Sequence, residues 1–369
     1  MKFTCLQENL LKGLSIARQS SSRATTLPVL QTFLLQGDKG SLTISSTNLE
    51  IGIRVHIRGK EESEGAICIP QDTLLAYIRN LPQDKLDLTV IDDKLTIEQG
   101  KDITAEFKGI IADEFPQLPQ IEADKQLVVG SIELKQALKT VYGALPKNDF
   151  RPEISGVYIA KKDQQLIFVG TDGFRLSEKR ITLSSPAEEN FSLIIPSKTV
   201  AEIIRVLDAL EEIEVTLQFG ASQIHIIADT VEIISKLIEG NFPQYEGLIP
   251  QTFQTVVDVD SQELVQAIKL ASVFSQNTVH DVKLTIQDDS TLSISSSDSQ
   301  VGANTTKLPV HSTGETGLAV AFNYNYLLDG IQLFGDKPIQ FNVNDTDSPV
   351  IIKSPDIPDF FYLIMPIRD

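Results

Sequence analysis

The chain has 369 residues, of which 41% are hydrophobic, and a length of this order corresponds to two or three domains. Its 32 basic and 50 acidic residues give a formal net charge of −18, which argues against a protein that grips nucleic acid through a generally positive surface. No apolar run approaches the ~20 residues of a membrane span, and the N-terminus lacks the apolar core of a signal peptide. The two cysteines, Cys5 and Cys68, form no CxxC motif and suit a reducing compartment, so we expect a cytoplasmic protein.

Each third of the chain begins with a predicted amphipathic helix. Residues 9–18 carry a weak apolar stripe through Leu10 and Leu14, whereas stronger stripes follow Ser131 and Ser261. Each of these serines is predicted to cap its helix, because an acidic residue follows in the first turn, where the helix dipole favours negative charge.

Three sequence anchors recur along the chain at nearly one offset. A strand that ends in a small polar turn recurs at offsets of 124 and 126 residues, as LTISSTN (42–48), LIFVGTD (166–172) and LSISSSD (292–298). A short apolar strand that runs into a second helix recurs at an offset of 126 residues (66–70, 192–196 and 318–322). A third anchor recurs once after 127 residues, as EFPQ (114–117) and NFPQ (241–244). The agreement of these offsets predicts a triplicated unit.

The repeated unit reads helix, strands, helix, strands over roughly 123 residues, which is an ordinary domain size. Strands that follow one another through short turns predict antiparallel sheets, with the two helices of each unit on one face. The further predicted strands span residues 52–57, 88–97, 157–159, 213–217, 223–227 and 339–343. We therefore predict an α+β fold of three tandem two-helix domains, at residues 1–122, 123–252 and 253–369.

The sequence offers little catalytic or metal-binding chemistry. The histidines, His56, His225, His280 and His311, lack the spacing of metal ligands, and the sequence contains no GxSxG, Walker or GxGxxG motif. No metal, cofactor or catalytic residue is therefore predicted. Acidic pairs at residues 61–62 and 92–93 leave a paired-carboxylate hydrolase as one rival interpretation, although such polar stretches usually form solvated loops.

Basic residues recur on the predicted helices of this acidic chain. They are Lys12, Arg18, Arg79, Lys135, Lys139, Lys198, Arg205 and Lys269. If the helices share one direction, these side chains build a local positive field. Otherwise they are the solvated sides of amphipathic helices, and the protein would be a repeat scaffold that binds protein peptides without DNA.

Seven short segments spread along the whole chain form a specific combination. They are MKFT (1–4), TLPVL (26–30), IP (69–70), TDGFRL (171–176), SKLIEG (235–240), FPQY (242–245) and MPIR (365–368). Together with the threefold repeat they resemble the family of bacterial DNA sliding clamps, the beta subunits of the DNA polymerase III holoenzyme. The resemblance implies the DNA clamp fold, in which two chains join head to tail as a ring of six domains with helices around a central hole.

The resemblance also implies a function and its partners. A ring that encircles double-stranded DNA is retained by topology, so a few sequence-independent contacts suffice and no active site is expected. The implied partners are a second copy of the chain, the replicative DNA polymerase, an ATP-dependent clamp loader and other proteins with a clamp-binding motif, and no membrane is involved. The implied DNA contacts are Lys12, Arg23, Lys135, Lys139, Lys147, Arg151, Lys198, Arg205 and Lys269.

Two further surfaces follow from the resemblance. A groove between the second and third repeats is implied to bind short linear peptides through Ile154, Thr171, Gly173, Phe174, Arg175, Leu176, Pro243, Leu248, Asn323, Tyr326, Pro349, Leu363, Met365, Pro366, Ile367 and Arg368. At the dimer seam, Phe107 is expected to face Val273 and Phe274 of the partner subunit. The chain departs from the family pattern at four positions, which are Asp72, Phe174, Glu246 and the terminal Asp369, and Arg23 stands one residue further from the Leu-Pro pair than is usual.

Overall fold

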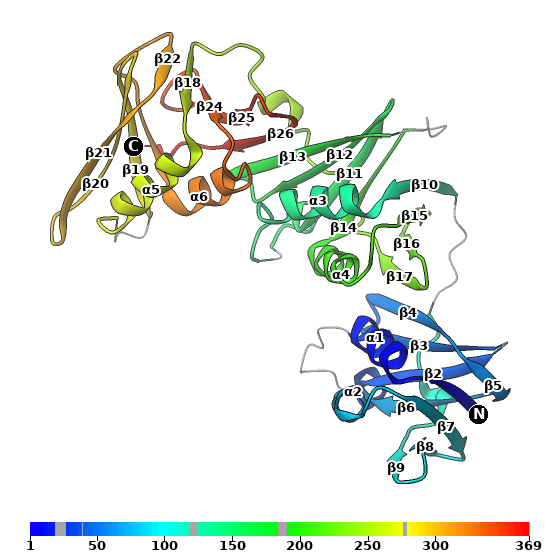
Figure 1. Cartoon of the computed structure of the whole chain (residues 1–369). Helices are drawn as coiled ribbons and strands as arrows, with labels where there is room; N and C mark the ends of the chain where they lie inside the picture. Colours follow the sequence, from blue (N-terminus) through cyan, green and yellow to red (C-terminus); the bar gives the residue numbers. More distant parts are fainter. Residues whose placement is uncertain are drawn as a thin grey trace. The chain divides into compact units, whose positions relative to one another are not determined.

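The computed structural model describes residues 1–18, 27–38, 40–118, 124–148, 150–183, 190–275 and 279–368. Within these ranges the chain forms six α-helices and four sheets, and every pair of neighbouring strands is antiparallel. The residues group into two compact units, one of residues 1–135 and 201–237 and one of residues 136–200 and 238–369 (Figure 1). The predicted α+β class is confirmed.

The first unit contains two sheets. The five-stranded sheet has the order β5-β1-β7-β8-β9, with bounds β1 (Lys2–Leu6), β5 (Lys60–Ser63), β7 (Lys85–Ile91), β8 (Lys94–Gln99) and β9 (Ile103–Lys108). The eight-stranded sheet has the order β10-β15-β16-β17-β4-β3-β2-β6, with bounds β2 (Thr32–Asp38), β3 (Ser41–Thr47), β4 (Ile51–Arg58), β6 (Gly65–Pro70), β10 (Lys125–Gly130), β15 (Glu214–Phe219), β16 (Gln223–Ala228) and β17 (Val231–Lys236). Two helices, α1 (Gln7–Ala17) and α2 (Gln71–Asn80), pack side by side, and two 3-10 turns are η1 (Pro28–Gln31) and η2 (Ala112–Glu114).

The second unit also contains two sheets. The nine-stranded sheet has the order β14-β11-β12-β13-β26-β25-β24-β18-β22, with bounds β11 (Gly156–Lys162), β12 (Gln165–Thr171), β13 (Arg175–Thr182), β14 (Phe191–Pro196), β18 (Thr255–Val259), β22 (His311–Thr313), β24 (Ile339–Val343), β25 (Val350–Ser354) and β26 (Ile357–Ile364). The four-stranded sheet has the order β21-β20-β19-β23, with bounds β19 (Asp281–Asp288), β20 (Thr291–Asp298), β21 (Gly302–Pro309) and β23 (Ala319–Asn323). Two helices, α5 (Ser261–Ser272) and α6 (Tyr324–Gln332), pack together, and two 3-10 turns are η3 (Pro152–Ile154) and η4 (Glu246–Leu248).

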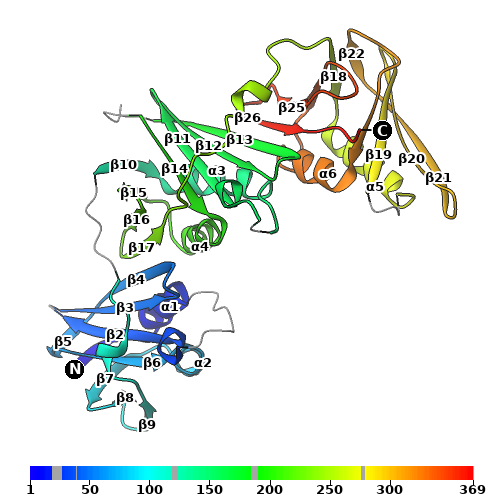
Figure 2. The ribbon, with the colours of Figure 1, turned by 180° about the vertical axis from the view of Figure 1, so that it is seen from behind.

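Strand pairing between the repeats explains why the chain groups into two units. One half of the second repeat joins the first repeat because β17 pairs with β4, and the other half joins the third repeat because β13 pairs with β26. Figure 2 shows β26 between β13 and β25. The helices α3 (Ser131–Tyr142) and α4 (Ser197–Asp208) accordingly contribute residues to both units. The boundary predicted after residue 122 lies outside the described residues, the one predicted after residue 252 falls between η4 and β18, and both remain predictions.

The recurring polar turn has the same geometry in all three repeats. The side-chain oxygens of Asn48, Asp172 and Asp298 each accept hydrogen bonds from the backbone N–H groups two and three residues further along, at 2.7–3.2 Å. Asn and Asp favour this turn because their short side chains mimic a backbone carbonyl. The sequence repeat therefore forms the same hairpin turn three times, between β3 and β4, between β12 and β13 and between β20 and β21.

The apolar helix stripes lie in the cores, as predicted. Leu264 and Ile268 of α5 are fully buried and pack in one cluster with Leu327 and Ile331 of α6. Burial of one such side chain contributes roughly 1.5–3 kcal/mol. The apolar stripe of α3 is likewise buried; it consists of Leu134, Leu138 and Val141, and Leu145 just after the helix. The opposite sides of α3 and α5 expose lysines, Lys139 and Lys269.

Two local predictions are wrong. Residues 88–97 form no single strand, because Asp92 adopts a left-handed φ of 54° and turns the chain between β7 and β8. The α5 helix is capped by Asp260 and not by Ser261, since the Asp260 side chain accepts from the N–H groups of Gln262 and Glu263. The Ser261 hydroxyl instead donates to the carbonyl oxygen of Gly335. In both cases an aspartate makes the turn or the cap that the apolar pattern alone did not reveal.

Candidate functional site

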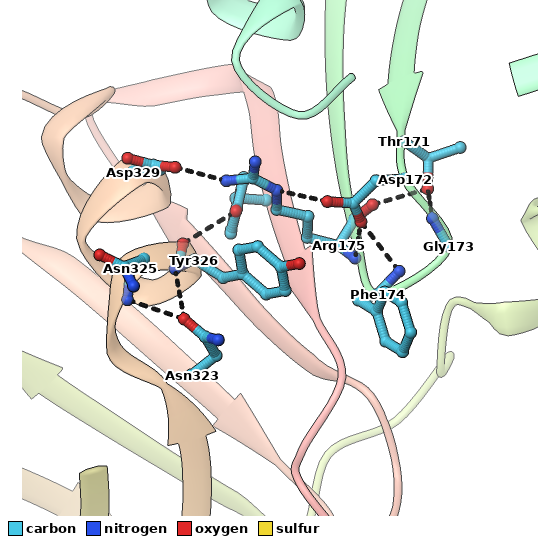
Figure 3. A network of polar contacts seen from close by, with 10 residues as sticks. Thr171, Asp172, Gly173, Phe174, Arg175, Asn323, Asn325, Tyr326 and Asp329 are labelled. Carbon is cyan, nitrogen blue, oxygen red and sulfur yellow. Dashed lines mark hydrogen bonds and ion pairs between the residues drawn. The ribbon is translucent and has the colours of Figure 1, made fainter. Parts of the chain in front are cut away.

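The polar turn of the second repeat has two further hydrogen bonds, of the kind that Thr47 also makes in the first repeat. The Thr171 hydroxyl donates to the carbonyl oxygen of Arg175 at 2.6 Å and accepts from the N–H of Gly173, whose φ is 90° (Figure 3). Glycine suits this conformation because it has no Cβ to clash. The turn thereby presents Phe174 outward, with 62% of the residue exposed, and directs Arg175 inward.

Arg175 links the second repeat to the third by charge. Its side chain is only 4% exposed; its Nε donates to Asp172 at 2.9 Å and its Nη1 to Asp329 of α6 at 2.6 Å. The guanidinium carbon also lies 4.4 Å from the centre of the Tyr326 ring, a cation–π geometry (Figure 3). Burial opposes the charge, but the neighbouring Tyr362 and Asp329 outweigh it and raise the pKa of Arg175. The Arg175 guanidinium is therefore held in place by two carboxylates and an aromatic ring.

Two adjoining cavities lie beside this turn. The first has a volume of about 220 Å³ and lies between the turn, η4 and the chain after β26; its apolar lining includes Leu176, Leu248, Leu363 and Met365. The second has a volume of about 360 Å³ and is lined by Phe150 and Tyr326 together with basic side chains. Phe174 borders both cavities and stacks on Tyr326, with ring centres 6.4 Å apart. Together the two cavities form a groove with apolar walls and cationic edges, and we call this pair the groove.

The structure brings most of the residues predicted for the groove together. Ten of the sixteen line the first cavity, namely Ile154, Thr171, Gly173, Phe174, Arg175, Leu176, Pro243, Leu248, Leu363 and Met365, and Tyr326 lines the second. The other five line neither cavity; they are Asn323, Pro349, Pro366, Ile367 and Arg368. Asn323 instead caps α6 and so positions Tyr326, while the N–H of Ile367 bonds to the carbonyl oxygen of Ala321.

Sequence reasoning missed several lining residues. Phe242 and Tyr245 line the first cavity, and Lys147 and Phe150 line the second. The recurring FPQ anchor marks the segment that carries Phe242 and Tyr245, so the repeat could have indicated them. Phe150 has no comparable sequence signal; it is 88% exposed and lines the second cavity together with Phe174 and Tyr326.

The residues predicted to contact DNA differ in their surroundings. Lys12, Lys198 and Lys269 are exposed on α1, α4 and α5, and Lys139 is exposed on α3. Lys147 and Arg151 are also exposed, and both border the groove. Arg23 lies outside the described residues.

Arg205 and Lys135 already have protein partners. The Arg205 guanidinium donates to the carbonyl oxygens of Ser15 and Ile16 at 3.2 and 2.8 Å and pairs with Glu202 at 2.7 Å. It therefore satisfies carbonyl groups at the C-terminal end of α1, where the helix dipole favours a cation. Lys135 lies 3.4 Å from Asp208.

Of the residues predicted for the dimer seam, Phe107 lies on one edge strand and Phe274 lies beside another. Phe107 is on β9, the last strand of the five-stranded sheet, and its ring packs edge-on against Tyr77 with centres 5.3 Å apart. Val273 and Phe274 follow α5, and Phe274 lies beside Gly302 of β21, the edge strand of the four-stranded sheet. Val273 is 57% exposed.

Two histidines that look scattered in the sequence share one carboxylate. His56 Nε2 and His225 Nε2 lie 2.9 and 3.0 Å from the two oxygens of Glu232, and Arg54 lies 3.6 Å away. Hydrogen bonds from His225 and His56 lower the pKa of Glu232. The cluster stands across the pairing of β4 with β17, so it ties the first repeat to the second.

Metal ligands, membrane-spanning helices and paired acids were three other features to consider in the described chain, and the first two are absent from it. Over the described ranges, no group of three or more His, Cys, Asp or Glu side chains is arranged to hold a metal ion. No helix in the same ranges is long and apolar enough to cross a membrane. In the predicted acidic pairs, Glu62 bonds Lys2 and Lys60, the half-buried Glu61 accepts from the N–H of Gly40, and Asp92 forms the turn between β7 and β8.

Comparison with known proteins accounts for almost the whole chain. Three models of one family match in order: the DNA polymerase III beta subunit N-terminal domain at residues 1–119, the central domain at residues 129–244 and the C-terminal domain at residues 246–368. The chain belongs to the DNA polymerase III beta subunit family. The three repeats are therefore the three clamp domains of this family.

Relatives in this family match the chain over its full length. The beta sliding clamps of Bacillus subtilis and Synechococcus elongatus are 25% and 27% identical, and the alignments cover 100% of this chain and 100% and 99% of theirs. The DNA polymerase III beta subunit of Thermotoga maritima has a TM-score of 0.92 at 27% identity, covering 100% of this chain and 99% of that one. The sliding clamp of Pseudomonas aeruginosa bound to griselimycin has a TM-score of 0.94 at 26% identity, covering 100% of both chains.

Proposed function

We propose that this chain is the sliding clamp of a bacterial replication machinery, a processivity factor that encircles duplex DNA as a head-to-tail homodimer. The observation that carries the proposal is the ordered match of three beta-subunit domains along residues 1–368. Members of this family are non-catalytic, and the chain is not an enzyme. The hydrolase interpretation is therefore abandoned.

The strand pattern supports closure of two chains into a ring. The strand after the polar turn of one repeat pairs with the last strand of the next repeat, as β4 with β17 and β13 with β26. In the described part of the chain, β21 is the strand after the polar turn of the third repeat and β9 is the last strand of the first repeat. Both are edge strands of their sheets. Pairing β21 of one copy with β9 of the other repeats the rule once more at each seam. Unpaired sheet edges are natural templates for such pairing.

The length of these edges fits the proposed seam. Each internal seam has five paired positions, and β9 and β21 span six and eight residues. Phe107 on β9, Phe274 beside β21 and the exposed Val273 that precedes it would then add apolar contacts to the backbone ladder. A second copy related head to tail would close the ring with six domains.

Retention on DNA by topology agrees with the charge of the chain. A net charge of −18 opposes tight phosphate binding, so only local positive groups could contact DNA. We place these contacts on the exposed helix lysines, Lys12, Lys139, Lys198 and Lys269, with Lys147, Arg151 and Arg23 as further candidates. Arg205 and Lys135 are engaged with the protein, so their part in DNA contact would be indirect.

The groove is proposed to bind the short linear motifs of the polymerase, the clamp loader and other partners. Its apolar walls would receive apolar side chains of the peptide, and Met365 can adapt to different shapes. The groove lies in the second and third domains and leaves the proposed ring seam free. We also place the protein in the cytoplasm, where bacterial chromosomes are copied.

The decisive test is retention on closed DNA. The purified chain should have the solution mass of a dimer, and after loading it should stay on a nicked circular plasmid but leave once the plasmid is cut open. The rival peptide scaffold predicts no difference between circular and linear DNA. A monomer that never remains on circular DNA would overturn the proposal.

A further inference from the structure

One wall of the groove is formed by the connection between the second and third repeats. Residues 242–249, here called the wall segment, belong to the connection from β17 to β18 and pack against the nine-stranded sheet. Phe242, Pro243, Tyr245 and Leu248 of this segment line the first cavity. The position of the segment therefore sets the width of the groove.

A buried hydrogen bond holds the middle of the wall segment. The Tyr245 hydroxyl donates to Glu178 Oε2 on β13 at 2.6 Å, and the two residues are only 4% and 1% exposed. Arg180 Nε donates to the other oxygen, Oε1, at 2.7 Å. Hydrogen bonds to charged groups are stronger than neutral ones, and a buried acceptor that loses its partner is penalised. The Tyr245 hydroxyl is thus directed to the sheet and away from the cavity.

The other attachments of the wall segment are of a different kind. Phe242 stacks on Tyr158 of β11, with ring centres 4.6 Å apart. Glu246 pairs with Lys162 at 2.7 Å, but both side chains are about half exposed, and exposed ion pairs contribute little. The bond from Tyr245 to Glu178 is therefore the buried polar anchor of this segment.

The first and second repeats form a natural comparison. Leu118 holds the place of Tyr245 in the sequence anchor of the first repeat, and Arg54 holds the place of Glu178 on the strand. Leu118 packs directly over Gly52, where an added Cβ would lie 2.5 Å from its Cδ2 atom. The cavity at that seam has a volume of only about 80 Å³, against about 220 Å³ in the second repeat. The larger cavity accompanies the tyrosine–carboxylate anchor.

We propose that Glu178 and Tyr245 are positioning residues that hold the wall segment against β13 and thereby keep the groove open for peptide binding. This inference rests on the proposed function of the groove. Glu178 lines neither cavity, so it would act on the peptide only through Tyr245. Loss of the bond should let the wall segment shift and weaken peptide binding, while DNA retention and dimerisation stay unchanged.

The test compares peptide affinity across a small set of variants. The probe is a fluorescein-labelled peptide that carries the clamp-binding motif of the replicative polymerase from the same cell, titrated by fluorescence anisotropy. We expect Tyr245→Phe and Glu178→Ala to bind roughly five- to tenfold more weakly, since each removes one partner of a buried charged hydrogen bond. Glu178→Gln can still bond the Tyr245 hydroxyl and should stay within about twofold of the parent protein.

A matched control separates this role from general stability. Ser354→Ala removes the hydrogen bond of another buried side chain, from the Ser354 hydroxyl to the carbonyl oxygen of Pro338 at 2.7 Å, away from the groove lining. It should leave peptide affinity unchanged. In hydrogen exchange, the amides of residues 242–249 should exchange faster in Tyr245→Phe than in Ser354→Ala.

The outcomes distinguish this inference from the function on which it rests. If the parent protein does not bind the peptide, the proposed groove function fails. If the parent binds but Tyr245→Phe and Glu178→Ala bind as tightly as it does, with unchanged exchange in the wall segment, the positioning role is overturned. Weaker peptide binding by Tyr245→Phe and Glu178→Ala, together with near-parental binding by Glu178→Gln, supports the positioning role.

Discussion

Arg175 of β13 and Asp329 of α6 form a 2.6 Å ion pair, so the second and third domains are joined by a side-chain bridge in addition to the pairing of β13 with β26. The two ends of this bridge differ in exposure. The Arg175 side chain is 4% exposed, whereas that of Asp329 is 53% exposed. Replacing Arg175 and replacing Asp329 should therefore lower the free energy of unfolding by different amounts.

Arg175→Ala should destabilise the protein by about 3 kcal/mol, because it leaves the buried Asp172 carboxylate without its cation. It should also weaken peptide binding, since the Tyr326 ring loses the guanidinium that stacks on it. Asp329→Asn, at the exposed end, should cost less than about 1 kcal/mol. Urea denaturation of both variants checks the two values, and equal costs would contradict this account.

The pairing of β4 with β17 joins the first repeat to the second, and its stability should depend on pH in the acid range through Glu232. His225 and His56 lower the pKa of this carboxyl in the folded protein, with burial opposing them. Protons then bind the unfolded chain more readily than the folded one, so the stabilisation is present above the usual carboxyl pKa. It is lost as the pH falls below about 4.5 and through the lowered folded pKa.

Glu232→Gln removes this contribution and provides the measurement. At pH 7 it should destabilise the first unit by about 1 kcal/mol, and the difference from the parent protein should shrink as the pH falls below about 4.5. Urea midpoints at several pH values give the comparison. Glu64→Gln, an exposed change between β5 and β6, should follow the parent curve throughout. A constant difference for Glu232→Gln at all pH values would disprove the linkage.

Much of the fold was accessible from the sequence because its signals are local. The spacing of Leu264 and Ile268 shows which side of α5 is buried, and the recurrence of Asn48, Asp172 and Asp298 marks one turn three times. These features depend on residues that are close along the chain. The predicted groove was located by the family resemblance, which names positions from both the second and third domains.

The seams could not be predicted from residue patterns. Alternation along β4 shows which side chains are buried but not that its edge pairs with β17, about 180 residues later. The sharing of Glu232 by His56 and His225 follows from that pairing and has no sequence signal of its own. The anchor from Tyr245 to Glu178 is hidden for the same reason, since 67 residues separate the two.

The proposed ring seam makes Val273 a sensitive position. Val273→Asp places a charge on an exposed apolar side chain and should leave the fold intact, because the side chain is not in the core. If it lies at the seam, burial of the unpaired charge should weaken the dimer by about 100-fold, or roughly 2.7 kcal/mol. Sedimentation at micromolar concentration measures the dimer. Ile91→Asp, at an exposed apolar side chain at the end of β7, is the control, and a dimer unchanged in both variants would place the seam elsewhere.

The exposed helix lysines should contribute to DNA contact but not to DNA retention. Each lysine that contacts a phosphate releases counterions, so the slope of log K against log salt changes by about 0.9 for each contact with B-DNA. Binding of the Lys12→Gln, Lys198→Gln and Lys269→Gln triple variant to a short duplex, measured by anisotropy over a range of salt, should therefore show a slope shallower by up to about 2.7. Arg205→Gln should change the slope little but lower stability, because Arg205 satisfies carbonyl oxygens of α1. Once loaded, the triple variant should still remain on closed circular DNA, since a ring is held by its topology; loss of retention would show that charge and not closure keeps this protein on DNA.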